Sequence, residues 1–535
     1  MTFSALKHAA VQTAAPLGPA LFLAILSLWV FTRNNDFPLD YHPDERGKVL
    51  QLIDPTHTRN FNHPLLMLEA AAAVRDWLHI DNDERANVIA GRWASAALAS
   101  IAVLALAVAG YYAAGYQGLV ICGSMAALCP PLNVYAHFFK EDTALVAGLA
   151  VAILGATRLI ATDQRSKQGF AAALMGVGCA AALSGKYVGL ATVGPCLVTI
   201  CVAPGFALRP LLLRFVAFAV PAAAGVFAFN VYAFQSLVPP RLIPAALQRM
   251  GGEFIDATTG HEGLALSIPN TFSLKVSLSE MMPDVWLFLA FGMVALMARS
   301  VFDRSTVVLG FFLLTFGVVL SYSSFPFPRY ALPITVLGYF VSGQLIASAL
   351  RGLKQPRRFK QAMVALCLGL IVALQGTRCW RFDMQFADDS RQRLHEWAAR
   401  NLPVEATILV EDYTALDGPG DPWRHPDQAT IQARVLRARS AADLGKSIGQ
   451  LKAAGIDYVV VAEPRYERYF RPAIHGGSFG QPEDLTEHQR FYRELFAGAD
   501  LVWSSAPSPA SHAYLDPQLR AYRLSNATTN ALKSE

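Results

Sequence analysis

Hydrophobic residues gather in long runs through the first 380 positions of the chain, and the runs then stop. The first run covers residues 14–31. Further runs lie near residues 90–111, 118–136, 142–161, 169–184, 187–204, 211–233, 284–298, 305–322, 330–350 and 361–378. Because a helix needs about 20 mostly apolar residues to cross a bilayer, the pattern predicts a polytopic α-helical membrane protein with about 11 transmembrane helices.

The remainder of the chain has the pattern of a small α/β domain. The segment "SRQRLHEWAARNL" has helical spacing and is followed by the apolar strand "ATILVED". The same order returns in "AADLGKSIGQLKAAG" and "IDYVVVAE", and "LRAYRL" is expected to add an edge strand. Helices that alternate with apolar strands predict a partly parallel sheet. We therefore divide the chain into a membrane domain, 1–379, and a soluble domain, 380–535.

Composition supports this division and excludes some classes of function. Of the 535 residues, 53% are hydrophobic and 16% are charged, whereas ordinary soluble domains carry about 25% charged residues. The net charge of +5 is small for this length, so nucleic-acid binding is not indicated. Most of the seven cysteines lie inside apolar runs, and no disulfide framework or thiolate metal site is indicated.

Basic residues beside the runs predict the orientation, because positively charged loops stay in the cytoplasm. With the N-terminus inside, the cytoplasmic loops carry Arg158, Arg165, Lys167, Arg209, Arg214, Arg299, Arg304, Arg351, Lys354, Arg357, Arg358 and Lys360. An odd number of spans then places the loops 32–89 and 234–283 and the soluble domain outside. In a bacterium this means the inner membrane, with the C-terminal domain in the periplasm.

The first outer loop contains the charged stretch "DYHPDERGK", which includes Asp44 and Glu45. A carboxylate at the mouth of a membrane helix stays ionised in water and can act as a general base if it lies within hydrogen-bond reach of a hydroxyl. The alternative is a solvated loop whose charges have no role.

A second polar segment, "FFKEDTAL", places Lys140, Glu141 and Asp142 on the same outer face. Taken alone, these residues also fit the start of a helix, where acidic side chains interact favourably with the helix dipole. Lys186 and Arg329 share that face in the predicted topology. Carboxylates and cations above apolar helices suit a reaction on a lipid that carries a phosphate.

Five motifs, in this order, carry a family resemblance: "LDYHPDERGKVLQL", "FNHPLL", "FFKEDTAL", "SGKYVGLA" and "FPRYALP". Over residues 15–350 the chain resembles the membrane glycosyltransferases of the GT-C superfamily, and within it the protein mannosyltransferase and aminoarabinose-transferase branch. The resemblance implies inverting transfer of a sugar, on the outer face, from a polyprenyl-phosphate donor to an acceptor hydroxyl.

The resemblance also implies roles for single residues. Asp44 is the expected base, Glu45 its helper or alternative, and Asp142 the second acidic position. Lys186 and Arg329 are expected to contact the donor phosphate. Arg46 and Lys48, which depart from the family pattern, are alternatives to Lys186 in that role. The other residues expected to line or support the cavity are His42, His63, Lys140, Glu141 and Tyr330. The alternative role of His63 is packing of the outer loop, and that of Tyr330 is an aromatic side chain at the membrane interface.

Several alternatives stay open from the sequence. A divalent metal on Asp44, Glu45 and His63 is possible, although the spacing matches no established ligand pattern. A secondary transporter would also have many spans and a few charges, but transporters keep such charges near the middle of the bilayer. A membrane scaffold without catalysis would leave the acidic pair idle. The sugar is not identified, and the acceptor is a protein, a lipid or a glycan.

Overall fold

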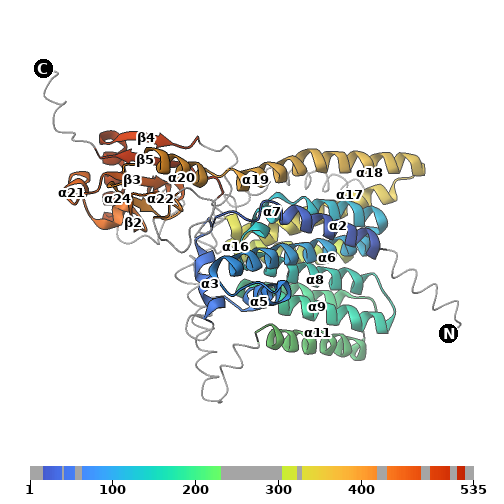
Figure 1. Cartoon of the computed structure of the whole chain (residues 1–535). Coiled ribbons are helices and arrows are strands. Elements are labelled where there is room, and N and C mark those ends of the chain that lie inside the picture. Colours follow the sequence, from blue (N-terminus) through green and yellow to red (C-terminus); the bar gives the residue numbers. More distant parts are fainter. Residues whose placement is uncertain are drawn as a thin grey trace, which may run out of the picture. The chain divides into compact units, whose positions relative to one another are not determined.

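The computed structural model describes residues 16–38, 41–54, 63–205, 207–230, 304–321, 328–418, 430–470, 482–506 and 515–524. The chain divides into two compact units (Figure 1). The first comprises Met1–Asn35, Gln51–Asn82 and Ile89–Arg381, and the second comprises Asp36–Leu50, Asp83–Val88 and Phe382–Glu535. Two short segments from the N-terminal part of the chain thus belong to the second unit.

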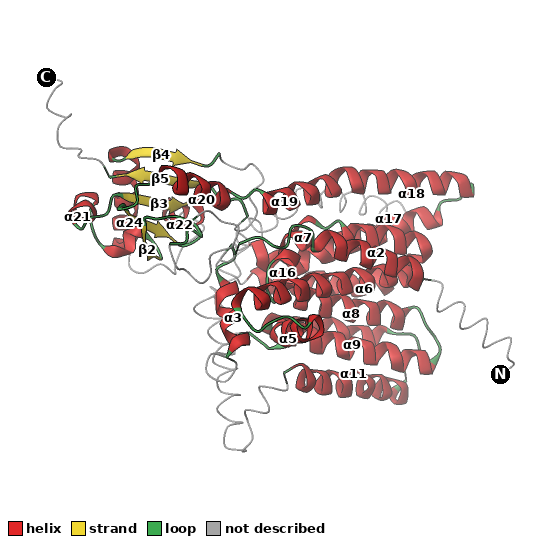
Figure 2. Ribbon diagram, viewed as in Figure 1, coloured by secondary structure: helices red, strands yellow, loops and turns green. Residues whose placement is uncertain are grey.

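The first unit is built from helices (Figure 2). Its helices are α2 (Leu17–Phe31), α5 (Leu66–Leu78), α6 (Glu84–Ala127), α7 (Pro130–His137), α8 (Asp142–Ile160), α9 (Arg165–Gly185), α10 (Val193–Val202), α11 (Leu208–Phe229), α16 (Arg304–Ser321), α17 (Leu332–Gly352), α18 (Arg357–Ile371) and α19 (Thr377–Ala387), joined in places by the short turns η1 (Tyr187–Thr192), η3 (Pro328–Ala331) and η4 (Val372–Gly376). The last helix continues into the second unit. Within the described residues, seven helices are long and apolar enough to cross a membrane. The protein is therefore a helical membrane protein, as predicted.

The predicted spans coincide with helices wherever the structure describes the chain. The run at 284–298 lies outside the described residues, so the count of 11 stays a prediction. The runs at 90–111 and 118–136 fall largely on α6, which is interrupted where Gly115 has φ +69°. Glycine adopts this backbone conformation without steric strain, and the interruption lets the chain turn between two helical segments.

Small residues allow α8 and α9 to pack with their backbones in contact. A side chain at Gly148 would collide with the backbone of Ala182, and one at Gly178 would collide with the backbone of Ala152. Glycine at such positions lets membrane helices approach closely. This contact fixes the beginning of α8 beside the end of α9.

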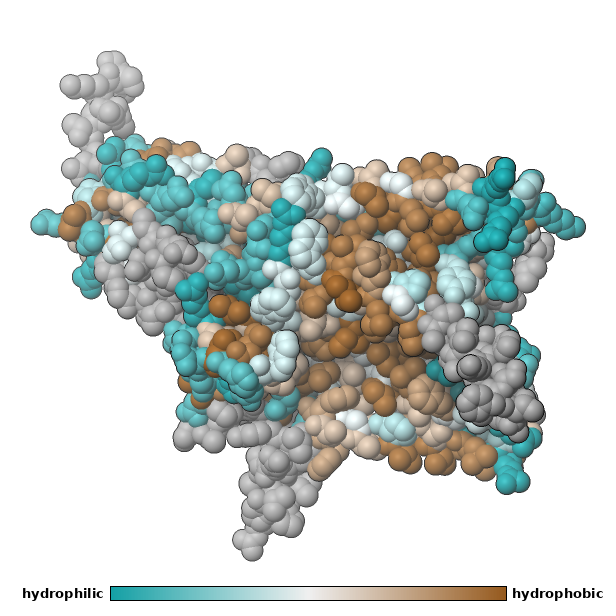
Figure 3. Space-filling model, turned by 45° about the vertical axis from the view of Figure 1, so that its right-hand side comes forward, coloured by the Kyte–Doolittle hydropathy of each residue, from teal (hydrophilic) through white to brown (hydrophobic). Residues whose placement is uncertain are grey.

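Apolar side chains cover much of the visible surface of the helical unit (Figure 3). In α2, for example, Phe22 and Ile25 are 65% and 66% exposed. An apolar surface of this kind is stable against lipid tails and unfavourable in water. The outer surface of the helices therefore fits a hydrocarbon environment.

The second unit contains a mixed five-stranded sheet. Its strands are β1 (Thr407–Glu411), β2 (Arg434–Ala438), β3 (Tyr458–Ala462), β4 (Asp500–Ser504) and β5 (Leu519–Arg523), in the order β2-β1-β3-β5-β4. β1 pairs in parallel with β2 and β3, whereas β5 pairs antiparallel with β3 and β4. The predicted partly parallel sheet is confirmed.

Helices cover both faces of this sheet. Leu394 and Ala398 of α20 (Ser390–Asn401) join one hydrophobic cluster with the strands. A separate cluster on the strands includes residues of α21 (Ile448–Ala453), α22 (Glu463–Phe470) and α24 (Pro482–Gly498). The second unit is therefore an α/β domain with its own core. α3 (Asp44–Ile53) begins in this unit and ends in the first.

Two expectations for this domain were wrong in detail. The segment 441–455 is not one helix, because Gly445 adopts a left-handed conformation between η5 (Ala441–Leu444) and α21, and Ser447 caps α21. "LRAYRL" forms β5, which is an inner strand, since β4 pairs with its other side. Most of "LDGPGDPWRHPDQ", expected as a loop, lies outside the described residues.

Candidate active site in the membrane unit

Two adjacent charged residues are buried at the turn between α7 and α8. Lys140 and Glu141 are each only 1% exposed. The Glu141 carboxylate lies 3.1 Å from Nζ of Lys140 and 3.1 Å from Nε2 of His63. Charged groups are seldom buried in a membrane protein unless they are paired or functional. The segment is thus a buried ionic cluster, which a solvated helix start would not produce.

Asp142 is the first residue of α8 and pairs with Lys186, which follows α9. Lys186 Nζ lies 3.1 Å from Asp142 Oδ1, and the two residues are 7% and 1% exposed. The second oxygen, Asp142 Oδ2, is buried and has no hydrogen-bond partner among the described residues. A buried acceptor without a partner is unfavourable by about 1–3 kcal/mol, and a ligand hydroxyl would satisfy it.

A pocket of about 60 Å³ opens beside this pair. Asp142 and Lys186 line it together with Arg329 and Tyr330, and the rest of its wall is mostly apolar. Lys186 Nζ lies 4.7 Å from the centre of the Tyr330 ring, and the Arg329 guanidinium lies 5.4 Å from the same ring. Two cations and one carboxylate give the pocket a net positive charge, which favours an anionic ligand. The structure thus brings together Asp142, Lys186, Arg329 and Tyr330.

Asn230, which the sequence analysis did not single out, connects the segment after His63 to the end of α9, close to Lys186. Its Oδ1 accepts a hydrogen bond from the backbone N–H of Leu65 at 2.9 Å, and its Nδ2 donates to Oγ of Ser184 at 2.7 Å. Leu65 lies two positions after His63, and Ser184 lies two positions before Lys186. The only signal in the sequence is an asparagine at the end of an apolar run, which does not reveal its partners.

The remaining candidates lie in the second unit. Asp44 and Glu45 begin α3, and their exposure differs: the Asp44 side chain is 39% exposed, whereas Glu45 is fully buried. His42 Nδ1 accepts a hydrogen bond from the backbone N–H of Asp44 at 3.2 Å. Lys48 lies one turn further along α3 and is 7% exposed. The expected approach of Asp44 to Asp142 stays a prediction.

No metal cluster is found in the part of the chain that the structure describes. There, no group of three or more histidine, cysteine, aspartate or glutamate side chains is placed to hold an ion. His63 contacts Glu141 in the first unit, whereas Asp44 and Glu45 belong to the second.

Comparison with known proteins gives matches among solved structures. No protein-family profile and no curated protein matches the sequence. The oligosaccharyltransferase AglB from Archaeoglobus fulgidus, solved with an inhibitory peptide and a dolichol-phosphate, matches with a TM-score of 0.50 at 12% identity, over 96% of this chain and 75% of that chain.

Two further structures are similar. ArnT from Cupriavidus metallidurans matches with a TM-score of 0.48 at 13% identity, over 95% of this chain and 98% of that chain. The S. cerevisiae protein O-mannosyltransferase complex Pmt1-Pmt2, bound to the sugar donor, matches with a TM-score of 0.35 at 17% identity, over 42% of this chain and 33% of that chain. At sequence identities this low, similarity to a solved structure is evidence about the fold alone. The match to AglB extends over nearly the whole chain, which therefore has a fold like that of this oligosaccharyltransferase.

Proposed function

We propose that the protein is an integral-membrane glycosyltransferase that moves a sugar from a polyprenyl-phosphate donor to an acceptor hydroxyl. The observation that carries this proposal is the pocket in which Lys186 and Arg329 accompany the open oxygen of Asp142. The dolichol-phosphate in the AglB structure and the undecaprenyl phosphate bound to ArnT from Cupriavidus metallidurans support a lipid phosphate as the carrier.

In this proposal Lys186 and Arg329 stabilise the departing lipid phosphate. Negative charge builds on the phosphate oxygen as its bond to the sugar breaks, and preorganised cations stabilise such charge most strongly where water is excluded. Lys186 is already held in place by Asp142, so little reorganisation accompanies the reaction. The Tyr330 ring contacts both cations. It separates them and gives the phosphate site an apolar wall on one side.

The acceptor is activated by a carboxylate. Asp44 takes the proton of the acceptor hydroxyl, the oxygen attacks the anomeric carbon, and the phosphate leaves from the opposite side with its electron pair. This displacement inverts the anomeric configuration. Asp44 is partly exposed, as a base that meets an incoming acceptor must be, and Glu45 supports it from a buried position. Asp142 Oδ2 accepts a hydrogen bond from a hydroxyl of the sugar.

The proposed orientation has the N-terminus in the cytoplasm and the second unit in the periplasm of a bacterium. Asp142 begins its helix and Lys186 follows its helix, so these charges lie at helix ends. A transporter would place its ion-binding charges near the middle of the spans, and this arrangement does not favour that function.

Reconstitution in vesicles tests the proposal. Vesicles with the full-length protein receive a panel of undecaprenyl-phosphate hexoses and pentoses, and release of undecaprenyl phosphate is measured. We expect release with at least one donor, and its loss in Lys186→Met and Arg329→Gln. Equal release by these variants and the unchanged protein would overturn the assignment of the phosphate site. Uptake of free sugar without any donor cleavage would instead support a transporter.

A further inference from the structure

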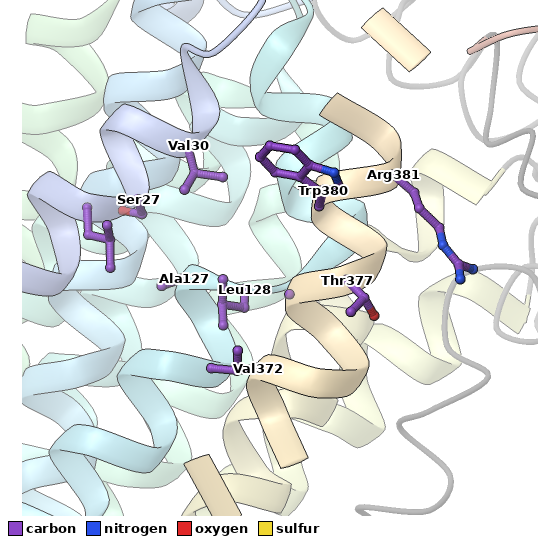
Figure 4. Close-up of a pocket in the computed structure, with 10 residues that line it drawn as sticks. Ser27, Val30, Ala127, Leu128, Val372, Thr377, Trp380 and Arg381 are labelled. Carbon is purple, nitrogen blue, oxygen red and sulfur yellow. The ribbon is translucent and has the colours of Figure 1, made fainter. Parts of the chain in front are cut away.

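A second cavity lies elsewhere in the first unit, between α2 and the segment from η4 to α19. Its volume is about 550 Å³, and Leu26 and Val30 of α2 face Val372, Gly376 and Trp380 across it. Figure 4 shows Trp380 directed from α19 toward α2, whereas Arg381 points to the opposite side. The lining residues of this groove do not overlap with those of the pocket around Asp142.

The groove has a structural cause in its own helix. Residues Val372–Gly376 form a π-helical turn between α18 and α19. Such turns widen a helix locally and are frequent at functional sites. Gly376 leaves room there, because an added Cβ would contact only Val372 and Leu128, at 3.7 and 3.8 Å. The hydroxyl of Ser27 donates to the carbonyl of Ala24 and that of Thr377 to the carbonyl of Ala373, so the wall is mostly apolar, with Arg381 as its one charged residue among those described.

The cation of Arg33 lies beside the groove, against the lining residue Trp380. The Arg33 guanidinium lies 4.0 Å from the centre of the Trp380 ring and 5.8 Å from that of Trp29. No carboxylate among the described residues forms an ion pair with it. The two tryptophans are 51% and 61% exposed, and exposed tryptophans on membrane helices gather at the level of the lipid head groups.

We propose that this groove binds an anionic phospholipid, with one hydrocarbon chain between α2 and α19 and the phosphate at Arg33. The apolar wall fits a lipid chain, and the aromatic faces hold the guanidinium where a head group would meet it. A phosphodiester carries a single negative charge, which the Arg33 guanidinium balances. A terminal phosphate carries up to about two charges, and its better match is the pocket with both Lys186 and Arg329. In the proposed orientation the lipid belongs to the outer leaflet.

Fluorescence quenching tests this site without reference to activity. The full-length protein is reconstituted in vesicles of phosphatidylcholine that contain either brominated phosphatidylglycerol or brominated phosphatidylcholine. The difference between the unchanged protein and Trp380→Phe isolates the signal of Trp380. A basic residue near the membrane surface is worth about 1 kcal/mol of attraction to an anionic lipid, so we expect phosphatidylglycerol to be preferred by about five-fold.

Three variants separate the groove from general effects. Arg33→Gln is expected to reduce the preference to about one. Arg381→Gln removes the charge of a residue that also lines the groove but whose side chain is directed away from α2, and it is expected to retain the preference. Gly376→Leu fills the groove and is expected to decrease quenching of Trp380 by both lipids.

Three results would overturn the proposal. One is an equal response to both lipids in the unchanged protein. Another is equal loss of preference in Arg33→Gln and Arg381→Gln, which would indicate a diffuse charge effect. The third is displacement of phosphatidylglycerol by an equal membrane fraction of undecaprenyl phosphate, which would identify the carrier lipid as the occupant.

Discussion

Lys186 Nζ lies 3.1 Å from Oδ1 of Asp142, although 44 residues separate the two in the sequence. The contact joins the end of α9 to the beginning of α8, two helices whose glycines permit direct backbone contact. Both side chains are buried, and each is the counter-ion of the other. Substitutions in this pair therefore test the proposed activity of the membrane unit.

Breaking one side of this pair is expected to harm both stability and transfer. Asp142→Asn leaves the Lys186 ammonium group buried without its counter-ion, which typically destabilises a protein by about 3–5 kcal/mol. In the double variant with Lys186→Met, stability is expected to return while donor cleavage stays lost. Thermal unfolding in detergent and donor cleavage measure the two effects. Activity that returned together with stability would show that the pair is only structural.

Asp44→Asn is expected to reduce transfer by about 10²–10⁴-fold, the usual contribution of a general base. Because the Asp44 side chain is 39% exposed, the unfolding temperature is expected to stay nearly constant. Glu45→Gln is the matched comparison, since Glu45 is fully buried and its replacement is expected to lower the unfolding temperature. Unchanged kcat/KM in Asp44→Asn would remove Asp44 from the mechanism.

Replacement of Asn230 is expected to loosen two segments together. Asn230→Ala removes the acceptor for the Leu65 N–H and the donor to Ser184, and each unsatisfied buried group is unfavourable by about 1–3 kcal/mol. Hydrogen exchange in the full-length protein is expected to accelerate at Leu65 and near the end of α9. The control is Thr315→Ala. The Thr315 hydroxyl donates one hydrogen bond, to the carbonyl of Phe311, in an exposed part of α16. Exchange that accelerates at neither segment would contradict this connecting role.

The stability of the second unit is expected to decrease between pH 4.5 and about 7. Burial raises the pKa of Glu411 from 4.5 to about 7, although Tyr492 and the backbone N–H groups of Ala441 and Ala462 hydrogen-bond to its carboxylate. In this range the folded state keeps a proton that the unfolded state has lost, so stability is full below pH 4.5 and is lost as the pH rises through 7.

The shift corresponds to at most about 3 kcal/mol. The free energy of unfolding of the second unit, followed in the full-length protein by urea denaturation at each pH, measures it. Glu411→Gln cannot titrate and is expected to lack this part of the pH dependence, though its overall stability is lower. The same pH slope in both proteins would assign the effect to another group.

The sequence alone predicted most of the elements correctly. The run at 142–161 corresponds to α8 (Asp142–Ile160), and "SRQRLHEWAARNL" corresponds to α20 (Ser390–Asn401). A membrane helix satisfies its backbone hydrogen bonds within its own segment, so its existence depends on local composition. An amphipathic helix with clear start and stop signals likewise depends mainly on its local sequence.

The partners of the charged residues were decided only by the tertiary structure. The sequence grouped Lys140, Glu141, Asp142 and Lys186 on one face, but did not show that Asp142 pairs with Lys186 or that Glu141 pairs with His63. It gave no indication of the hydrogen bonds of Asn230, of the π-helical turn at Val372–Gly376, or of β5 as an inner strand. Hydrophobicity is a property of each segment, whereas pairing depends on which helices and strands pack together, and that is set by contacts between residues far apart in the chain.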